Sequence, residues 1–348
     1  MIRRAALLLL LIGVGSCSAS APAETPDHDR TVRIEQTGEI QVYGTDGPEV
    51  MDISAVALDP DDSTRIAVVD RTRERVVLID LTRQAIISST DDRVQRPMDV
   101  AFKDGLLLIS VITPSVVHVA DRTTLRVSRS IPLVQTLFAG RVHPTAAGFL
   151  TESTDTHYPA AALFEYSLEG ELIRRWHGFS EDDVAPFWGG FFWEHAAVHG
   201  DEVFVASAMR HVLFRYDQAD EPTTFGGPPD EFRAPRRPER SEFSAFGESR
   251  AAYEEFARSF TMISSIWTTD RHLIVEHQDL DPEETGFRLP RYSLDVYDLE
   301  TLDRLDSRLT VGGPVLAVRG RDLLVLTTKP PSGPWVLSTF RVVPEGSR

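Results

Sequence analysis

The sequence predicts an all-β fold, a six-bladed β-propeller, and three observations lead to it. Short apolar, β-branched runs alternate with turns rich in Asp, Gly and Pro along most of the chain, which is the pattern of strands joined by hairpins. The same order of strands and turns recurs about six times at intervals of roughly 40–50 residues, the spacing of four-stranded propeller blades. The last repeat lacks a fourth strand, and a spare strand at residues 31–43 precedes the first repeat.

The clearest repeat lies at residues 53–81 and reads ISAVALDPDDSTRIAVVDRTRERVVLIDL. It predicts three strands, at 53–58, 65–69 and 75–81, which are separated by an Asp-Pro-Asp-Asp turn and a polar loop. The segment at 85–88 supplies a fourth, outer strand. One such sheet cannot bury both of its faces, so it needs copies of itself as neighbours.

Five further repeats follow, and we expect their first strands at Met98–Phe102, His143–Ala147, His195–Val198, Ile263–Trp267 and Val315–Val318. The sixth repeat ends after its third strand, at 335–342. We expect the spare strand at 31–43 to pair with it and close the ring, because closure removes the exposed sheet edges of an open array. Residues 31–344 then form a single propeller domain.

The repeat is interrupted in two places. Residues 185–195 concentrate aromatic side chains, which either form a platform for a ligand or fill a blade junction; these are Phe187, Trp188, Phe191, Phe192 and Trp193. Residues 225–260 form an insertion between the fourth and fifth blades. Its second half, from Ser249 to Phe260, predicts a helix with Ser249 as the N-cap.

The N-terminus predicts export. An apolar run at residues 5–14 follows two arginines and is short for a membrane span, so residues 1–16 are interpreted as a signal peptide. The run ends in Val-Gly-Ser-Cys, which is similar to a bacterial lipobox and implies a lipid on Cys17. Residues 17–30 then form a flexible tether. The alternative is ordinary signal cleavage after Ala21.

The composition excludes several classes of function. The chain has 53 acidic and 36 basic residues, a formal charge of -17 and no compensating basic run, so nucleic acid is not an expected partner. Cys17 is the only cysteine, which rules out internal disulfides, thiol catalysis and cysteine-based zinc sites. The sequence also lacks the G-x-S-x-G, P-loop and Rossmann patterns. Its histidines, among them His211, His272 and His277, show no metal-ligand spacing such as HExxH.

Three segments carry a resemblance to a known group of proteins: VALDPDDSTRIAVVDRTRERVVLIDL, DVAFKDGLLLIS and HGDEVFVASAMRHVLFRYD. These units resemble those of six-bladed propellers of the NHL/TolB-like group. Together with the lipobox, they make the chain similar to the uncharacterised "6-bladed β-propeller" lipoproteins of bacteria. The resemblance implies the fold and a lipid-anchored location in the bacterial cell envelope, facing the periplasm or the exterior. It includes no catalytic signature.

In a propeller, the first residues of each innermost strand surround a central channel. Alignment of the repeats places six polar residues there, namely Ser54, Asp99, His143, Glu194, His195 and Ser264. Calcium or another divalent cation could bind to Asp99 and Glu194, with His143 or His195 as a base. Such a site would resemble propeller lactonases of the SMP-30 and paraoxonase type, whose asparagine ligands this ring lacks. A water-filled channel without a cofactor is the simpler expectation.

These observations predict an exported, membrane-anchored binding or scaffold module rather than an enzyme. Its ligand would be a protein, a peptide or a glycan, and it would contact the membrane through the N-terminal lipid alone. The aromatic residues at 187–193 are the expected binding residues. The alternative is a metal-dependent, lactonase-like hydrolase with a cation in the central channel.

Overall fold

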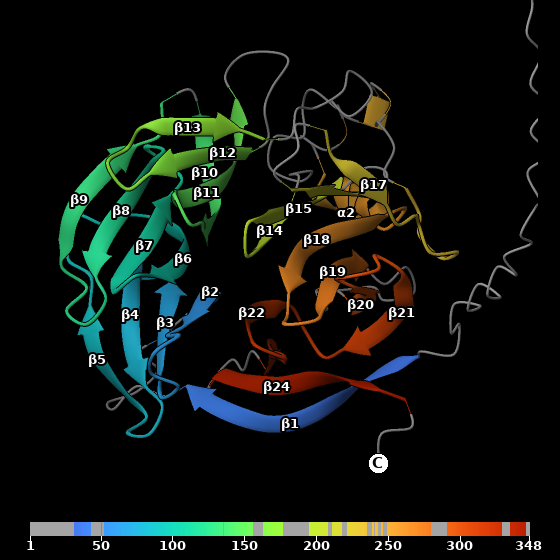
Figure 1. Cartoon of the computed structure of the whole chain (residues 1–348), viewed down its shortest axis with the longest axis horizontal. Helices are drawn as coiled ribbons and strands as arrows, with labels where there is room; N and C mark the ends of the chain where they lie inside the picture. Colours follow the sequence, from blue (N-terminus) through green and yellow to red (C-terminus); the bar gives the residue numbers. More distant parts are fainter. Residues whose placement is uncertain are drawn as a thin grey trace, which may run out of the picture. The chain divides into compact units, whose positions relative to one another are not determined.

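The structure is a computed structural model that describes residues 31–42, 50, 52–134, 136–155, 163–176, 195–207, 211–217, 221–234, 239, 241, 242, 245, 249–279, 291–328 and 335–345. These residues form six four-stranded antiparallel sheets, arranged as a six-bladed β-propeller (Figure 1). The predicted fold is therefore confirmed.

In the first three blades, the strands follow one another outward from the ring centre in chain order. Blade 1 consists of β2 (Ile53–Leu58), β3 (Arg65–Asp70), β4 (Arg75–Asp80) and β5 (Ala85–Ser89). Blade 2 consists of β6 (Pro97–Lys103), β7 (Leu106–Val111), β8 (Val116–Asp121) and β9 (Val127–Pro132). Blade 3 consists of β10 (Thr136–Pro144), β11 (Gly148–Asp155), β12 (Leu163–Ser167) and β13 (Leu172–Arg175).

The last three blades repeat this order, except that the outer strand of blade 6 comes from the N-terminal part of the propeller. Blade 4 consists of β14 (His195–His199), β15 (Glu202–Ser207), β16 (Val212–Tyr216) and β17 (Thr223–Phe225). Blade 5 consists of β18 (Thr261–Thr268), β19 (His272–Asp279), β20 (Arg291–Asp298) and β21 (Arg304–Val311). Blade 6 consists of β22 (Val315–Arg319), β23 (Asp322–Thr328), β24 (Trp335–Pro344) and β1 (Val32–Val42).

The blades form a closed ring through their innermost strands. Each innermost strand contacts the next one around the ring, in the order β2, β6, β10, β14, β18 and β22, and β22 contacts β2. In the described part of the chain, each of the six blade interfaces has its own cluster of buried apolar side chains. Leu107 and Leu108, successive residues of β7, are both fully buried. Successive strand residues point to opposite faces, so each middle strand packs against both neighbouring blades.

The ring closes where the two ends of the propeller pair. Strand β1 runs antiparallel to β24, with Val32 opposite Pro344 and Val42 opposite Trp335. Just beyond the pair, the amide of Glu345 donates to the carbonyl of Thr31 at 2.8 Å. The predicted closure by an N-terminal strand is confirmed.

A β-bulge occurs in five of the six innermost strands, all of which the structure describes; β14 is the exception. In β10 the register shifts between Ala139 and Val142, so Gly140 and Arg141 form the bulge. This corrects one prediction: the first strand of the third repeat spans Thr136–Pro144 and not 143–147. The bulge interrupts the regular alternation that would otherwise mark the strand.

The insertion between blades 4 and 5 contains the predicted helix, α2 (Arg250–Ala257). The hydroxyl of Ser249 accepts a hydrogen bond from the amide of Ala252 at 3.4 Å, which is the N-cap arrangement. Phe256 and Phe260 are buried, with ring centroids 5.4 Å apart. No helix in the described part of the chain is long and apolar enough to cross a membrane.

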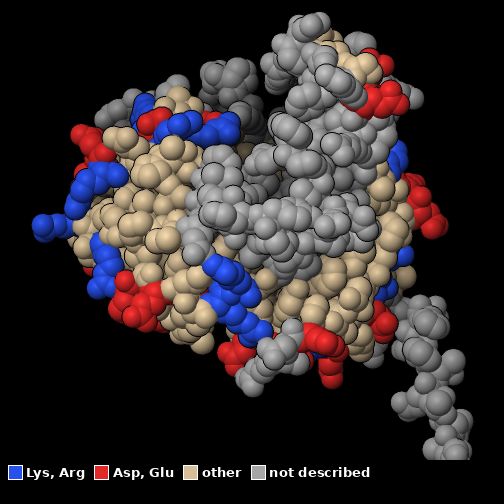
Figure 2. Space-filling view, turned by 90° about the horizontal axis from the view of Figure 1, so that it is seen from above, with Lys and Arg blue, Asp and Glu red and all other residues tan. Residues whose placement is uncertain are grey.

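The surface carries charges of both signs. Figure 2 shows basic and acidic residues interspersed around the described part of one face. Ion pairs contribute to this pattern: Arg122 pairs with Asp59 and Asp61, and Arg341 of β24 pairs with Asp322 on the neighbouring strand β23. The arginine of the Arg341–Asp322 pair is exposed, so this pair contributes little to stability, about 0–1 kcal/mol.

Candidate functional site

The structure describes only part of the predicted site. Asp99, His143 and His195 lie in the innermost strands β6, β10 and β14. Outside the described residues lie the lipidation candidate, one metal-ligand candidate and the aromatic residues of the 185–195 segment, namely Cys17, Glu194, Phe187, Trp188, Phe191, Phe192 and Trp193.

A buried carboxylate joins the two predicted histidines. Glu152 Oε1 lies 3.0 Å from Nε2 of His143, and Glu152 Oε2 lies 3.4 Å from Nδ1 of His195. The amide of Ala196, in the next blade, also donates to Oε1 at 2.9 Å. Burial would raise the pKa of Glu152, but the contacts with both histidines outweigh it and hold this pKa well below its ordinary value. Glu152 is therefore ionised and connects blade 3 to blade 4.

Glu276 occupies the corresponding place in blade 5. Its carboxyl accepts hydrogen bonds from the hydroxyl of Ser264 and from the amide of Val315 in blade 6, both at 2.5 Å. Burial raises the pKa of Glu276 from 4.5 to about 7, because its two hydrogen bonds and the charges of Arg141 and His195 offset the desolvation only in part. Two carboxyl groups in equivalent positions therefore have pKa values on opposite sides of the ordinary range.

This raised pKa predicts a pH-dependent stability. Between pH 4.5 and 7, the unfolded chain has released the proton of Glu276 while the folded protein retains it, so stability falls as the pH rises. The effect is roughly 3 kcal/mol, because each pKa unit corresponds to 1.36 kcal/mol. We expect urea unfolding at pH 4.5 and 7.5 to show this loss in the wild type relative to Glu276→Gln, which has no titrating group there. Parallel pH profiles of the two proteins would contradict it.

An arginine supplies the positive charge at the ring centre. The guanidinium of Arg141, in the β10 bulge, lies 3.8 Å from the ring centroid of Trp267 in blade 5. It donates to the hydroxyl of Ser265 and, at 3.4 Å, to the carbonyl of Ile266. Burial raises the pKa of three carboxyl groups from three blades, and the charge of Arg141 opposes this effect in each; the three are Asp99, Glu152 and Glu276.

These groups have a clear architectural role. The carboxyl of Asp99 accepts the amide of Val142 at 2.9 Å and so joins blade 2 to blade 3, as Glu152 and Glu276 do for their own blades. Burial raises the pKa of Asp99, and Arg141 opposes this only in part. Within the described residues, Asp99, His143 and His195 do not bring three metal-ligating atoms together.

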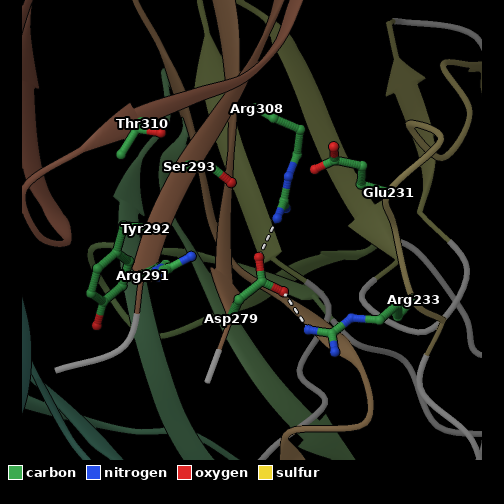
Figure 3. Close-up of a pocket in the computed structure, with 8 residues that line it drawn as sticks. All are labelled: Glu231, Arg233, Asp279, Arg291, Tyr292, Ser293, Arg308 and Thr310. Atoms are coloured by element: carbon green, nitrogen blue, oxygen red, sulfur yellow. Dashed lines mark hydrogen bonds and ion pairs between the residues drawn. The ribbon is translucent and has the colours of Figure 1, made fainter. Parts of the chain in front are cut away.

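A pocket of about 390 Å³ lies where the insertion meets blade 5, and this is the size of a small-molecule site. Figure 3 shows the side chains around it, which are Glu231, Arg233, Asp279, Arg291, Tyr292, Ser293, Arg308 and Thr310. The first two belong to the insertion, and the others to β19, β20 and β21. The pocket therefore lies between the insertion and the strands of blade 5.

Asp279 organises the arginines of this pocket. Its Oδ1 accepts from the hydroxyl of Thr261 at 2.7 Å and from Arg233 at 3.2 Å, and its Oδ2 pairs with Arg308. Burial would raise the pKa of Asp279, but these partners lower it below its ordinary value. Figure 3 shows the side chains of Arg233 and Arg308 directed toward this carboxylate.

The pocket has an excess of positive charge in a strongly acidic chain. Three arginines line it, Arg233, Arg291 and Arg308, against the two carboxylates of Glu231 and Asp279. A buried hydroxyl oxygen, that of Ser293, has no hydrogen-bond partner among the described residues. Guanidinium groups and a free hydroxyl are groups that recognise a carboxylate or another small anion.

The sequence did not indicate the most important of these residues. Arg141 lies two residues before His143, and the bulge in β10 hid its position at the ring centre. Glu152 and Glu276 are each the fifth residue of a second strand, where other repeats have small or apolar residues. A glutamate at a position where the other repeats have small or apolar residues is the sequence signal that could have identified these two carboxyl groups. The pocket arginines come from distant segments and left no local pattern.

Comparisons with known proteins support the fold. No protein-family model and no curated protein matches the sequence. The structure is similar to a member of the DUF4221 family from Bacteroides vulgatus ATCC 8482, with a TM-score of 0.65, 8% identity, and coverage of 91% of this chain and 99% of that one. It is also similar to a candidate exported protein of Bacteroides fragilis NCTC 9343, with a TM-score of 0.57, 10% identity, and coverage of 89% and 95%. At these identities, the likeness concerns the fold alone.

Proposed function

We propose that this propeller is a binding module and that the pocket between the insertion and blade 5 receives a carboxylate group of its ligand. The observation that carries the proposal is the convergence of three arginines on a pocket with only two carboxylates. In a chain with a formal charge of -17, this local excess of positive charge favours an anionic group over a neutral one.

The ligand itself is a peptide or a glycan that bears a carboxylate, as in an acidic side chain or a uronic acid. Charge-assisted hydrogen bonds from guanidinium to carboxylate are about twice as strong as neutral ones. The aromatic residues at 187–193 are proposed as further contacts with the same ligand. We also propose export to the bacterial cell envelope and anchoring by a lipid on Cys17, on the basis of the N-terminal sequence.

The alternative of a metal-dependent hydrolase receives less support. It places a cation between Asp99 and Glu194, with His143 or His195 as the base. The guanidinium of Arg141 already acts on Asp99, and both histidines contact Glu152. A resident positive charge and engaged imidazoles favour the binding module.

The proposal predicts selective retention of acidic ligands. On arrays of acidic and neutral peptides and oligosaccharides, the wild type should bind the carboxylate-bearing members. Arg233→Gln and Arg291→Gln should each weaken this binding about 10-fold or more, because a hydrogen bond to a charged group contributes roughly 1.5–3 kcal/mol. Calorimetric titration with the best array member would measure the loss.

The matched control is Arg83→Gln, which removes an exposed arginine paired with Asp80 in blade 1. This variant should bind as the wild type does. Equal binding of neutral ligands, or an equal loss in the control, would contradict the proposal.

A further inference from the structure

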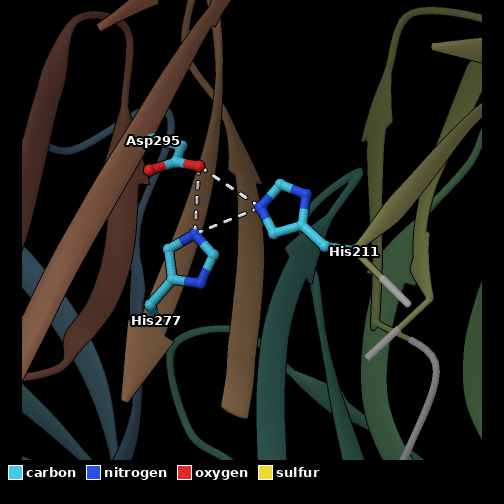
Figure 4. A group of neighbouring side chains, drawn as sticks. All are labelled: His211, His277 and Asp295. Atoms are coloured by element: carbon cyan, nitrogen blue, oxygen red, sulfur yellow. Dashed lines mark hydrogen bonds and ion pairs between the residues drawn. The ribbon is translucent and has the colours of Figure 1, made fainter. Parts of the chain in front are cut away.

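Two histidines and an aspartate meet in the interface between blades 4 and 5 (Figure 4). His211 directly precedes β16, His277 lies in β19 and Asp295 lies in the neighbouring strand β20. All three side chains are fully buried. The two histidines are 66 positions apart in the sequence, so their meeting depends on the packing of the two blades.

Three potential ligand atoms converge at this point. Nε2 of His211 and Nε2 of His277 each lie 3.2 Å from Oδ2 of Asp295. The two Nε2 atoms are 3.4 Å apart, and the rings are stacked with an interplanar angle of 6°. The second oxygen of Asp295 accepts the amide of Arg308 at 2.9 Å, which fixes the orientation of the carboxylate.

These distances match a tetrahedral metal site. A zinc ion that binds nitrogen and oxygen ligands at about 2.0–2.1 Å in tetrahedral geometry holds those ligand atoms roughly 3.3–3.4 Å from one another. The three observed separations are 3.2, 3.2 and 3.4 Å. We propose that His211, His277 and Asp295 bind a divalent first-row transition metal ion, with zinc as the first candidate.

Without an ion, this arrangement satisfies its polar atoms poorly. A neutral imidazole carries a proton on only one of its two nitrogens. Oδ2 of Asp295, the oxygen that faces both imidazoles, receives no hydrogen bond of standard geometry among the described residues. An unsatisfied buried polar atom costs about 1–3 kcal/mol. A cation would compensate the carboxylate and use both Nε2 lone pairs together.

The donor set selects the class of metal. Two imidazoles and one carboxylate suit zinc and neighbouring transition metals, whereas calcium and magnesium prefer oxygen ligands only. Phe232 of the insertion packs edge-on against both rings, with centroid distances of 5.0 Å to His211 and 6.0 Å to His277. The ion would therefore be shielded, with one coordination position not supplied by these three residues.

Such an ion would fasten blade 4 to blade 5 next to the start of the insertion. Metal binding would not depend on ligand binding in the pocket. The pocket arginines can be replaced without changing a metal ligand, and the metal ligands can be replaced without changing a pocket arginine. The two proposals therefore fail separately.

The test uses untagged full-length protein, stripped of metal with a chelator and titrated with zinc chloride against a chromophoric competitor. The wild type should bind one zinc per chain, and calcium should not compete. Loss of a residue that only hydrogen-bonds to a metal ligand weakens metal binding roughly 10–100-fold. His211→Gln and His277→Gln each remove a ligand, so each should weaken zinc binding by more than this. His272→Gln, which changes a histidine in the same strand β19 but outside the cluster, should bind as the wild type does.

Cobalt(II) binding to the wild type gives a second measurement, which does not depend on whether the histidine variants fold. Intense visible absorption bands, typical of four-coordinate cobalt, are expected on addition of one equivalent and should disappear when zinc is added. Absence of zinc binding, weak six-coordinate cobalt spectra, or an equal loss of affinity in His272→Gln would overturn the proposal.

Discussion

Replacement of Arg141 by methionine is expected to lower the free energy of unfolding by roughly 3–5 kcal/mol, the usual cost of removing one partner from a buried ionic group. The arginine supplies the positive charge that acts on three carboxyl groups from three blades, Asp99, Glu152 and Glu276. Methionine retains much of the length and apolar contact of the side chain. The decrease in the free energy of unfolding would therefore arise mainly from the missing charge and hydrogen bonds and not from a cavity.

Chemical denaturation of Arg141→Met at neutral pH would measure this effect. The control is Arg174→Met, because Arg174 also stacks on a tryptophan, Trp176, at 3.9 Å, but in the outer strand of blade 3. Its cation–π contact should contribute only about 0.5–1 kcal/mol. Similar losses in the two variants would show that Arg141 contributes through stacking and not through the carboxyl groups.

Deletion of residues 31–42 is expected to abolish stable folding of the ring. The deletion removes strand β1 and leaves the whole edge of β24 unpaired. It also removes Val32 and Val42, which are buried in two different interface clusters and contribute about 1.5–3 kcal/mol each. Together with the lost sheet pairing, this approaches the entire stability of a typical domain, about 5–15 kcal/mol.

Rescue by a peptide separates closure from other effects of the deletion. A synthetic peptide of residues 31–42 should restore a cooperative thermal transition when it is added to the deleted chain. A peptide with Ile34→Pro and Ile40→Pro should not, because proline cannot donate to the strand ladder. A deleted chain that unfolds at the wild-type temperature would contradict the importance of the closing strand.

The sequence predicted the fold because the propeller is encoded by local signals that are repeated. Alternation and turn residues marked nearly every strand, and the missing fourth strand of the last repeat indicated the closing pair. The exception was β10, where the bulge at Gly140 and Arg141 shifted the apparent start of the strand toward His143. A bulge has no strong sequence signature unless the pairing partner is known.

The candidate sites were much less accessible to sequence reasoning. His143 and His195 lie in the innermost strands of blades 3 and 4, but the sequence does not indicate Glu152, the carboxylate that joins them. His211 and His277 show no short metal-ligand spacing in the sequence, because their proximity arises between two blades. Which residues meet across an interface depends on strand register and blade order, and neither can be obtained from one repeat alone.

The pairing of β1 with β24 also has a consequence for the order of folding. Residues that pair in this seam are 293 to 312 positions apart, from Val42 with Trp335 to Val32 with Pro344, while most other strand pairs join neighbours in the chain. Local hairpins form early and distant pairs late. We therefore expect a folding intermediate in which five blades are assembled and β1 is not yet paired with β24. Pairing of these two strands would then be the slow, final step of folding.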